Sequence, residues 1–178
     1  QGTDDKYLKV IASPKHFVAN NVDGDRHFTN SKIDDKILRD YYFPAFRSSI
    51  VDGKAQGLMS AYNALNGVPC SGNTFLLNDL LRVEWGFKGH VVSDCGAIYN
   101  IHANHLFTET PHQGVALALK SGTDMNCGGQ YEKHLNEAYE IGLVSEIDID
   151  TSLKRILRSR FLLGVFDHPS LVPFSKIQ

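Results

Sequence analysis

Four short stretches with the composition of buried strands, separated by segments with helical spacing, constrain the fold of this chain more than any other feature. They cover residues 7–13, 56–62, 89–92 and 123–127. Each stretch is short and runs into polar or turn-forming residues. Strands that alternate with helices pair in parallel through right-handed crossovers. The sequence therefore predicts an α/β fold, built either as an open sheet or as part of a barrel.

Helical spacing fills the intervals between these strands. The first helix is predicted to begin at a capping box of Ser31 and Asp34 and to kink or restart at Pro44. A later helix is predicted to end at Gly122, and the histidine-containing stretch before that helix is predicted to be a loop. The remaining helical intervals are residues 74–86, 113–120, 130–141 and 149–162.

Polar side chains follow the apolar part of each predicted strand. Because the carboxyl ends of parallel strands gather at one edge of a sheet, we expect these side chains to lie together. A carboxylate, a cation, an imidazole and several amides suit a ligand with many hydroxyl groups, since each hydroxyl both donates and accepts hydrogen bonds. The sequence therefore predicts a sugar site formed by Lys15, His16, Tyr62, Asn63, Asp94, Asp124 and Asn126.

Each of these side chains also has a purely structural interpretation. Asp94 follows an apolar strand and precedes a turn, and an aspartate at such a place often caps the next helix. Lys15 can pair with a carboxylate, His16 can satisfy a buried carbonyl, and Tyr62 can anchor a loop. Four polar clusters at four strand ends favour a site, because each buried polar group would otherwise need its own compensating partner.

Composition excludes several classes of function. The net charge is −2 and there is no long run of Lys or Arg, which argues against a nucleic-acid or anionic-membrane partner. No apolar stretch approaches the length of a membrane span. The three cysteines lack the paired spacing of a zinc site. His102 and His105 could ligate zinc from one helical face, but without a third ligand a solvated loop is favoured. We therefore predict no metal and no cofactor.

Six segments of the chain form one ordered set with consistent spacing: residues 15–21, 38–46, 59–70, 84–89, 91–98 and 122–128. Together they resemble glycoside hydrolase family 3. The resemblance implies a (β/α)8 barrel of the TIM type, which typically needs about 250 residues. The whole chain, residues 1–178, would then be the second half of an N-terminal barrel domain, with about four βα units of parallel sheet and C-terminal helices.

The same resemblance implies a retaining β-glycosidase acting on an oligosaccharide. Asp94 would be the nucleophile that forms a covalent glycosyl-enzyme, and Lys15, His16, Met59 and Tyr62 would contact the sugar beside the scissile bond. A nucleophilic carboxylate must stay ionised, and a nearby ammonium favours the ionised form. Lys15 is the candidate for that supporting charge.

The residues after Asp94 bear on specificity. Many β-glucosidases of the family have tryptophan there, whereas xylosidase-like members often have the Cys-Gly found at Cys95-Gly96. A β-xylosidase acting on xylo-oligosaccharides is therefore favoured over a β-glucosidase or an α-L-arabinofuranosidase. The xylosidase-like pattern also carries a cysteine at Cys127, and we hypothesise that it pairs with Cys95, the alternative being two small buried side chains. A disulfide would indicate an oxidising compartment, and the family implies a secreted or periplasmic parent enzyme.

Part of the expected machinery has no match in the chain. A retaining glycosidase needs a second carboxyl group about 5 to 5.5 Å from the nucleophile. In this family that acid/base residue lies in a later sandwich domain, and residues 22–27 also depart from the family's loop pattern. The chain alone is thus predicted to be an inactive fragment whose partners are the rest of the barrel and the sandwich domain. The alternative is a non-catalytic carbohydrate-binding or interaction module.

Overall fold

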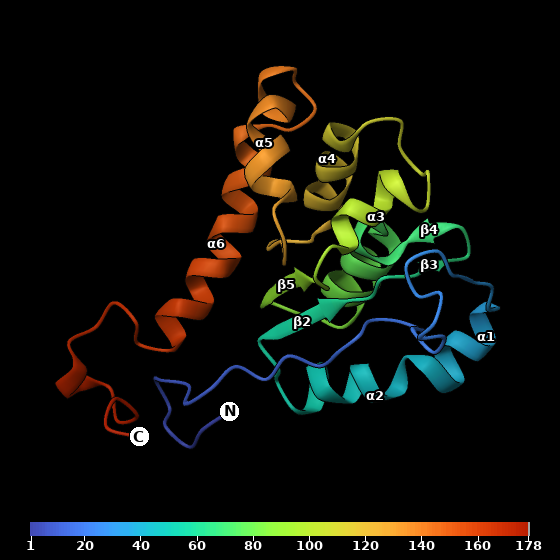
Figure 1. Ribbon diagram of the computed structural model, residues 1–178. Helices are drawn as coiled ribbons and strands as arrows, with labels where there is room; N and C mark the ends of the chain where they lie inside the picture. Colours follow the sequence, from blue (N-terminus) through green and yellow to red (C-terminus); the bar gives the residue numbers. More distant parts are fainter. Residues whose placement is uncertain (178) are drawn as a thin grey trace.

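The computed structural model describes residues 1–177 and has an α/β fold centred on two parallel strands. These strands are β2 (Gly57–Ser60) and β5 (His90–Ser93), which lie side by side in Figure 1. One further segment joins on each side through a single bridge, Phe17 beside Ser60 and Met125 beside Val92. The parallel pairing predicted from the alternation of strands and helices is confirmed for β2 and β5.

The prediction of a strand at residues 7–13 is wrong. The chain runs beside β2 in an irregular extended form, in which Gly57 N–H donates to the Ala12 carbonyl (3.1 Å). Pro14 has no N–H group, so a regular ladder cannot continue through it. Leu8 N–H instead donates to the Leu162 carbonyl (2.7 Å), which ties the start of the chain to the last long helix.

The fourth predicted strand, residues 123–127, is reduced to the single bridge at Met125. The N–H groups of both Asp124 and Met125 donate to the Val91 carbonyl, at 2.8 and 2.9 Å. Two successive donors converging on one acceptor are incompatible with the even spacing of a parallel ladder. The segment nevertheless keeps its place next to β5.

A second, small sheet was not predicted. It contains β1 (Asn30–Ser31), β3 (Ala64–Leu65) and β4 (Val68–Pro69), with β1 and β3 parallel and β3 and β4 antiparallel around Asn66 and Gly67. Because Ser31 lies in β1, it does not cap a helix. Asp34 is the cap instead, and its side chain accepts a hydrogen bond from Ile37 N–H at 2.9 Å.

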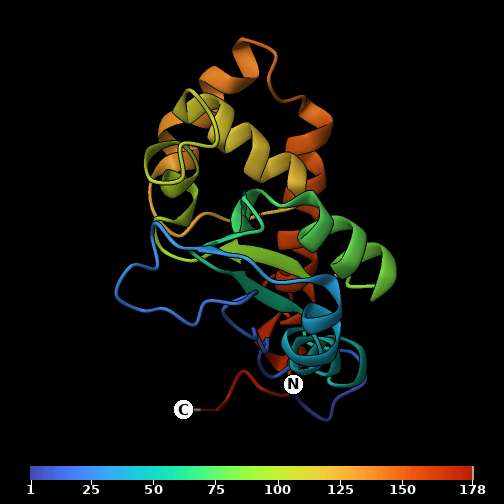
Figure 2. The same ribbon diagram turned by 90° about the vertical axis from the view of Figure 1, so that its right-hand side faces the viewer.

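The helices lie on both sides of β2 and β5, as Figures 1 and 2 show for α1 and α2 on one side and α4 and α5 on the other. Pro44 restarts the first helix, and Gly122, in the left-handed conformation, ends α4 as predicted. The histidine-containing stretch predicted as a loop begins as the helix α3. The helices are α1 (Asp35–Ile37), η1 (Leu38–Tyr42), α2 (Pro44–Arg47), η2 (Ser48–Asp52), η3 (Cys70–Gly72), η4 (Phe75–Glu84), α3 (Ala97–Ala103), α4 (Pro111–Ser121), α5 (Gln130–Glu140), α6 (Glu146–Leu162) and η5 (Pro169–Leu171).

Two apolar cores hold this arrangement. The larger packs the buried faces of Leu58 and Val91 against the leucines of η4, and the smaller joins α3, α4 and α5. Burying such side chains is the main favourable contribution to folding. The two strands are thereby fixed from the side of η4, and their carboxyl ends carry the polar residues described next. No helix within residues 1–177 is both long and apolar enough to cross a membrane.

Candidate active site

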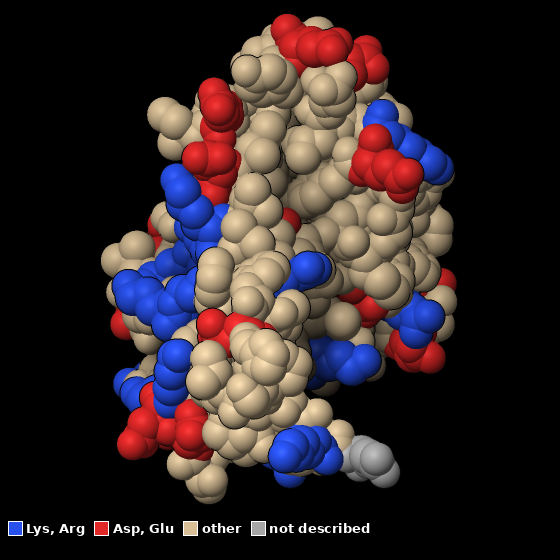
Figure 3. All heavy atoms as spheres, turned by 90° about the vertical axis from the view of Figure 1, so that its left-hand side faces the viewer, with Lys and Arg blue, Asp and Glu red and all other residues tan. Residues whose placement is uncertain are grey.

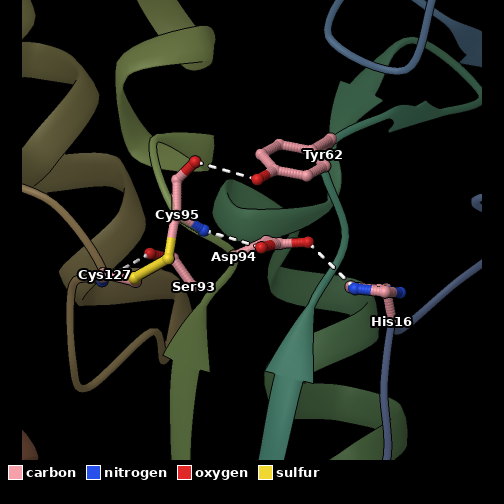
Figure 4. The surroundings of a disulfide bond; sticks show 6 residues. All are labelled: His16, Tyr62, Ser93, Asp94, Cys95 and Cys127. Carbon is pink, nitrogen blue, oxygen red and sulfur yellow. Dashed lines mark hydrogen bonds and ion pairs between the residues drawn. A yellow bond between two sulfur atoms is a disulfide. The ribbon is translucent and has the colours of Figure 1, made fainter. Parts of the chain in front are cut away.

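Asp94 directly follows β5, and its two carboxylate oxygens have different surroundings (Figure 4). Oδ1 accepts a hydrogen bond from Cys95 N–H at 2.7 Å. Oδ2 lies 3.1 Å from Nε2 of His16, and within residues 1–177 it accepts no well-aligned hydrogen bond. The residue is 8% exposed. The carboxylate does not cap α3, whose first turn is preceded by Gly96, so the capping interpretation is excluded.

His16 reaches Asp94 from the extended segment beside β2. Its side chain is 31% exposed, and its ring lies against the carboxylate as Figure 4 shows. Lys15, the predicted supporting charge, is exposed, and among the ion pairs of residues 1–177 the partner of Asp94 is His16 and not Lys15. Met59 is half-buried in β2, opposite Val92 of β5.

Tyr62 approaches the same place from the end of β2. Its hydroxyl donates to the Cys95 carbonyl at 3.0 Å, which brings the phenol next to the peptide that follows Asp94. Partial burial raises the pKa of Tyr62, and the neighbouring Asp94 carboxylate acts in the same direction. The phenol therefore stays neutral and remains a hydrogen-bond donor at neutral pH.

Three further residues hold Tyr62 and were not predicted for the site. The ring of His27 packs edge-on against the phenol ring at 4.4 Å between centroids, and the Arg26 guanidinium lies 5.1 Å from the same ring. Nε2 of His105 lies 2.8 Å from the Tyr62 carbonyl oxygen. Their loops carry no strand or helix periodicity, so the pattern of the chain gives no indication that they meet Tyr62.

Cys95 and Cys127 form a disulfide that joins the loop after β5 to the loop after Met125. Backbone and side-chain hydrogen bonds run beside it, from Gly96 N–H to the Cys127 carbonyl (2.8 Å) and from Cys127 N–H to Ser93 Oγ (3.1 Å). Figure 4 shows the disulfide next to Asp94. The third cysteine, Cys70, is buried elsewhere in the larger core, and burial raises the pKa of its thiol to about 12.

Asp124 and Asn126 do not join the site. The Asp124 carboxylate is fully buried and pairs with Arg82 (2.7 Å) and Arg155 (2.9 Å). Asn126 Oδ1 accepts hydrogen bonds from the first N–H groups of α5. The fourth predicted strand end therefore contributes the disulfide and not a ligand-binding carboxylate.

His102 and His105 are not positioned as a zinc pair. His102 lies on α3 beside the ring of Tyr99, and burial lowers its pKa, whereas His105 lies past the end of the helix and contacts Tyr62. Within the described residues, no group of three or more His, Cys, Asp or Glu side chains is placed to hold a metal ion.

The α/β fold built around β2 and β5 matches that of a family of glycoside hydrolases. Residues 1–159 match the family model described as the glycosyl hydrolase family 3 N terminal domain, so the chain belongs to this family. It is 42% identical to a xylan 1,4-beta-xylosidase of Xylanibacter ruminicola, over 99% of this chain and 21% of that protein. It is 39% identical to a probable exo-1,4-beta-xylosidase of Aspergillus clavatus, over 95% of this chain and 23% of that protein.

Solved structures agree with this assignment. A GH3 exo-beta-xylosidase in complex with a xylobiose aziridine activity based probe matches 99% of this chain with a TM-score of 0.95 at 34% identity. A beta-glucosidase from Listeria innocua matches 94% of the chain with a TM-score of 0.83 at 26% identity. The chain covers 24% and 23% of these two proteins, so it spans less than a quarter of the length of its relatives.

Proposed function

We propose that this chain is part of a retaining exo-β-xylosidase that acts on xylo-oligosaccharides, with Asp94 as the nucleophile. The observation that carries the proposal is the asymmetry of the Asp94 carboxylate. Oδ1 is held by Cys95 N–H at 2.7 Å, whereas Oδ2 lacks a well-aligned donor within residues 1–177. A carboxylate with one oxygen fixed and the other free is oriented and still able to form a new bond.

In the proposed reaction, Oδ2 of Asp94 attacks the anomeric carbon of the terminal sugar. The bond from that carbon to the glycosidic oxygen breaks, and the departing oxygen takes a proton from a second carboxyl group. The same group, now ionised, removes a proton from water, and the resulting attack releases the sugar and restores Asp94. His16, beside Oδ2, and the neutral phenol of Tyr62 supply hydrogen bonds to the sugar hydroxyls, with Lys15 and Met59 as further contacts.

The second carboxyl group is proposed to come from another part of a longer protein. Among residues 1–177, the groups that interact with the Asp94 carboxylate are the His16 imidazole, the Cys95 N–H and the Tyr62 hydroxyl, and no carboxyl group is among them. The chain also spans only 21% to 24% of the proteins that it matches. We therefore propose that the acid/base residue lies in a separate sandwich domain and that the chain alone is inactive.

We further propose that the fold is part of a (β/α)8 barrel. Four parallel segments lie side by side in the order of the sequence, starting with Phe17 and ending with Met125, and neither outer segment pairs with a further strand within residues 1–177. Apolar side chains also stay exposed near the end of α6, among them Phe161, Val165 and Phe166. Figure 3 shows the side of the molecule on which α6 lies in Figure 1, and residues other than Lys, Arg, Asp and Glu cover a broad area of it. Further strands and another domain would cover these edges and side chains.

A xylose substrate is preferred for two reasons. The Cys95–Cys127 disulfide lies next to Asp94, at the position where many β-glucosidases of the family carry tryptophan, and a disulfide there would shape the sugar subsite differently from that ring. The curated relatives that match at 39% to 42% identity are named xylosidases, whereas two β-glucosidase structures match at 33% and 26%. A β-glucosidase and an α-L-arabinofuranosidase are the alternatives within the family.

The proposal is tested on the longer protein that contains this chain. Incubation with a 2-fluoro xyloside, followed by peptide mapping, should label Asp94, and Asp94→Asn should abolish the label. Turnover of the nitrophenyl β-xyloside should exceed that of the β-glucoside and of the α-L-arabinofuranoside. Labelling of another residue would refute the assignment of Asp94 as the nucleophile. Faster turnover of the β-glucoside than of the β-xyloside would refute the proposed specificity.

The other class of function is a non-catalytic carbohydrate-binding or interaction module. It is favoured by the lack of a carboxyl group among the described contacts of Asp94. Binding of xylobiose by calorimetry, together with no turnover by the longer protein, would support it. Turnover of nitrophenyl β-xyloside by the isolated chain of 178 residues would instead refute the inactivity of the fragment.

A further inference from the structure

Cys95 links the proposed nucleophile to the phenol that is proposed to contact the sugar. Its N–H donates to Asp94 Oδ1 at 2.7 Å, its carbonyl accepts from the Tyr62 hydroxyl at 3.0 Å, and its sulfur is bonded to Cys127. All three contacts appear together in Figure 4. A shift of this one residue would therefore disturb both side chains at once.

Packing does little to hold Cys95 in place. The residue is exposed, and it is followed by Gly96, which has a left-handed conformation (φ 87°) and space for a side chain on all sides. A glycine is conformationally permissive, so the turn has little stiffness of its own. Cys95 is linked to residues outside the turn by the hydrogen bond to Tyr62 and, covalently, by the disulfide to Cys127.

The other end of the disulfide is firmly attached. Cys127 N–H donates to the hydroxyl of the fully buried Ser93 at 3.1 Å. The preceding residue, Asn126, accepts hydrogen bonds from the first N–H groups of α5 at 2.8 and 3.1 Å. The disulfide thus connects an exposed, glycine-containing turn to the buried end of β5 and to the start of a helix.

From these contacts we propose that Cys95 is a positioning residue, whose disulfide to Cys127 keeps the Asp94 carboxylate and the Tyr62 hydroxyl in register for the glycosylation step. The inference rests on the proposed function, in which Asp94 is the nucleophile. Reduction by a dithiol transfers two electrons and two protons to the disulfide, which gives two thiols while the reductant becomes a disulfide. The turn then keeps the hydrogen bond from Gly96 N–H to the Cys127 carbonyl (2.8 Å) but loses its covalent attachment, so the Cys95 N–H that donates to Oδ1 is held less firmly. Small displacements of reacting groups lower rates strongly, so glycosylation should slow by about 10- to 100-fold.

The test uses the longer protein in the oxidised and reduced states. The rate constant of labelling by the 2-fluoro xyloside should fall by about 10- to 100-fold on reduction, with a smaller change in the concentration that gives half-maximal labelling. Cys127→Ser should show the same loss without reductant. Reoxidation should restore the wild type only. Cys70→Ala, which removes the remaining cysteine and leaves the disulfide intact, should respond to reductant like the wild type.

Two outcomes overturn the inference. A purely structural disulfide would lower the thermal midpoint in Cys127→Ser but leave the labelling rate constant unchanged well below that midpoint. A crystal structure of the reduced protein in which Cys95 N–H and Asp94 Oδ1 stay hydrogen-bonded would also contradict the positioning role, whatever the activity of the protein. Labelling of the oxidised wild type at a residue other than Asp94 would instead refute the proposed function, so the two failures are distinguishable.

Discussion

Asp94 and Asp124 come from the same kind of sequence, an acidic residue next to a short apolar segment of the sheet, yet their surroundings differ completely. Both oxygens of Asp124 are paired, with Arg82 at 2.7 Å and Arg155 at 2.9 Å, and its side chain is fully buried. Asp94 has one oxygen held by a backbone N–H and the other beside His16. The fully paired Asp124 carboxylate holds the fold together, whereas the carboxylate proposed as the nucleophile keeps one oxygen without a hydrogen bond within residues 1–177.

The largest expected effect comes from making the same substitution at both positions. In the longer protein, Asp94→Asn should lower xyloside turnover by at least about 10³-fold, because the proposed nucleophile is lost, with little change in thermal stability. Asp124→Asn should destabilise the protein by about 3–5 kcal/mol, because it leaves two buried or half-buried guanidinium groups without their charge partner. Thermal unfolding and turnover per folded molecule, measured for both variants, separate the two roles. If Asp94→Asn unfolds the protein, or Asp124→Asn is stable and inactive, the contrast is wrong.

The sequence predicts the elements with clear periodicity and misses those without it. The parallel pair β2 and β5 and the helices α4 and α6 follow from apolar spacing, and α4 ends at Gly122 as predicted. Two-residue strands such as β1 are too short to show any period, which is why Ser31 was interpreted as a helix cap.

The difference between the two aspartates could not be predicted for a related reason. The partners of Asp124 lie 42 and 31 residues away, at Arg82 and Arg155, and no local pattern connects them. His16 likewise lies far from Asp94 in the sequence, in the extended segment that runs beside β2 on the edge opposite β5. Convergence at the strand ends predicts that polar groups gather, but not which of them remain free.

A smaller effect is expected from the two tyrosines that belong to these regions. Tyr62 donates to the Cys95 carbonyl at 3.0 Å in the site, and Tyr131 donates to the Thr123 carbonyl at 2.6 Å near Asp124. Replacing one neutral hydrogen bond changes the free energy by about 1 kcal/mol. Tyr62→Phe should therefore lower kcat by about three- to tenfold with little loss of stability.

Tyr131→Phe is the matched variant on the structural side. Burial raises the pKa of Tyr131 well above its usual value, which agrees with a neutral, desolvated hydroxyl. Its loss should lower the thermal midpoint and leave kcat unchanged. Steady-state kinetics and thermal unfolding of both variants test these different roles. An unchanged kcat in Tyr62→Phe would show that the Tyr62 hydroxyl does not act in the site.

The smallest effect should appear in the pH dependence of stability near Asp124. Burial lowers the pKa of His90, although the Asp124 carboxylate opposes the shift, and Nδ1 of the ring lies 2.8 Å from the Ser159 hydroxyl. The lowered pKa means that the folded protein binds a proton on the His90 ring less readily than the unfolded chain does. His90 therefore favours the folded state above about pH 6.5, and this contribution is lost as the pH falls. His90→Asn keeps a hydrogen-bonding group near Ser159 but does not titrate, so its thermal midpoint should fall less than that of the wild type between about pH 7.5 and pH 5.5. His168→Asn removes an exposed histidine and should behave like the wild type. If the thermal midpoints of His90→Asn and the wild type change with pH in parallel, the region around Asp124 tolerates a charged imidazole. That result would weaken the distinction between a closed structural cluster at Asp124 and an open site at Asp94.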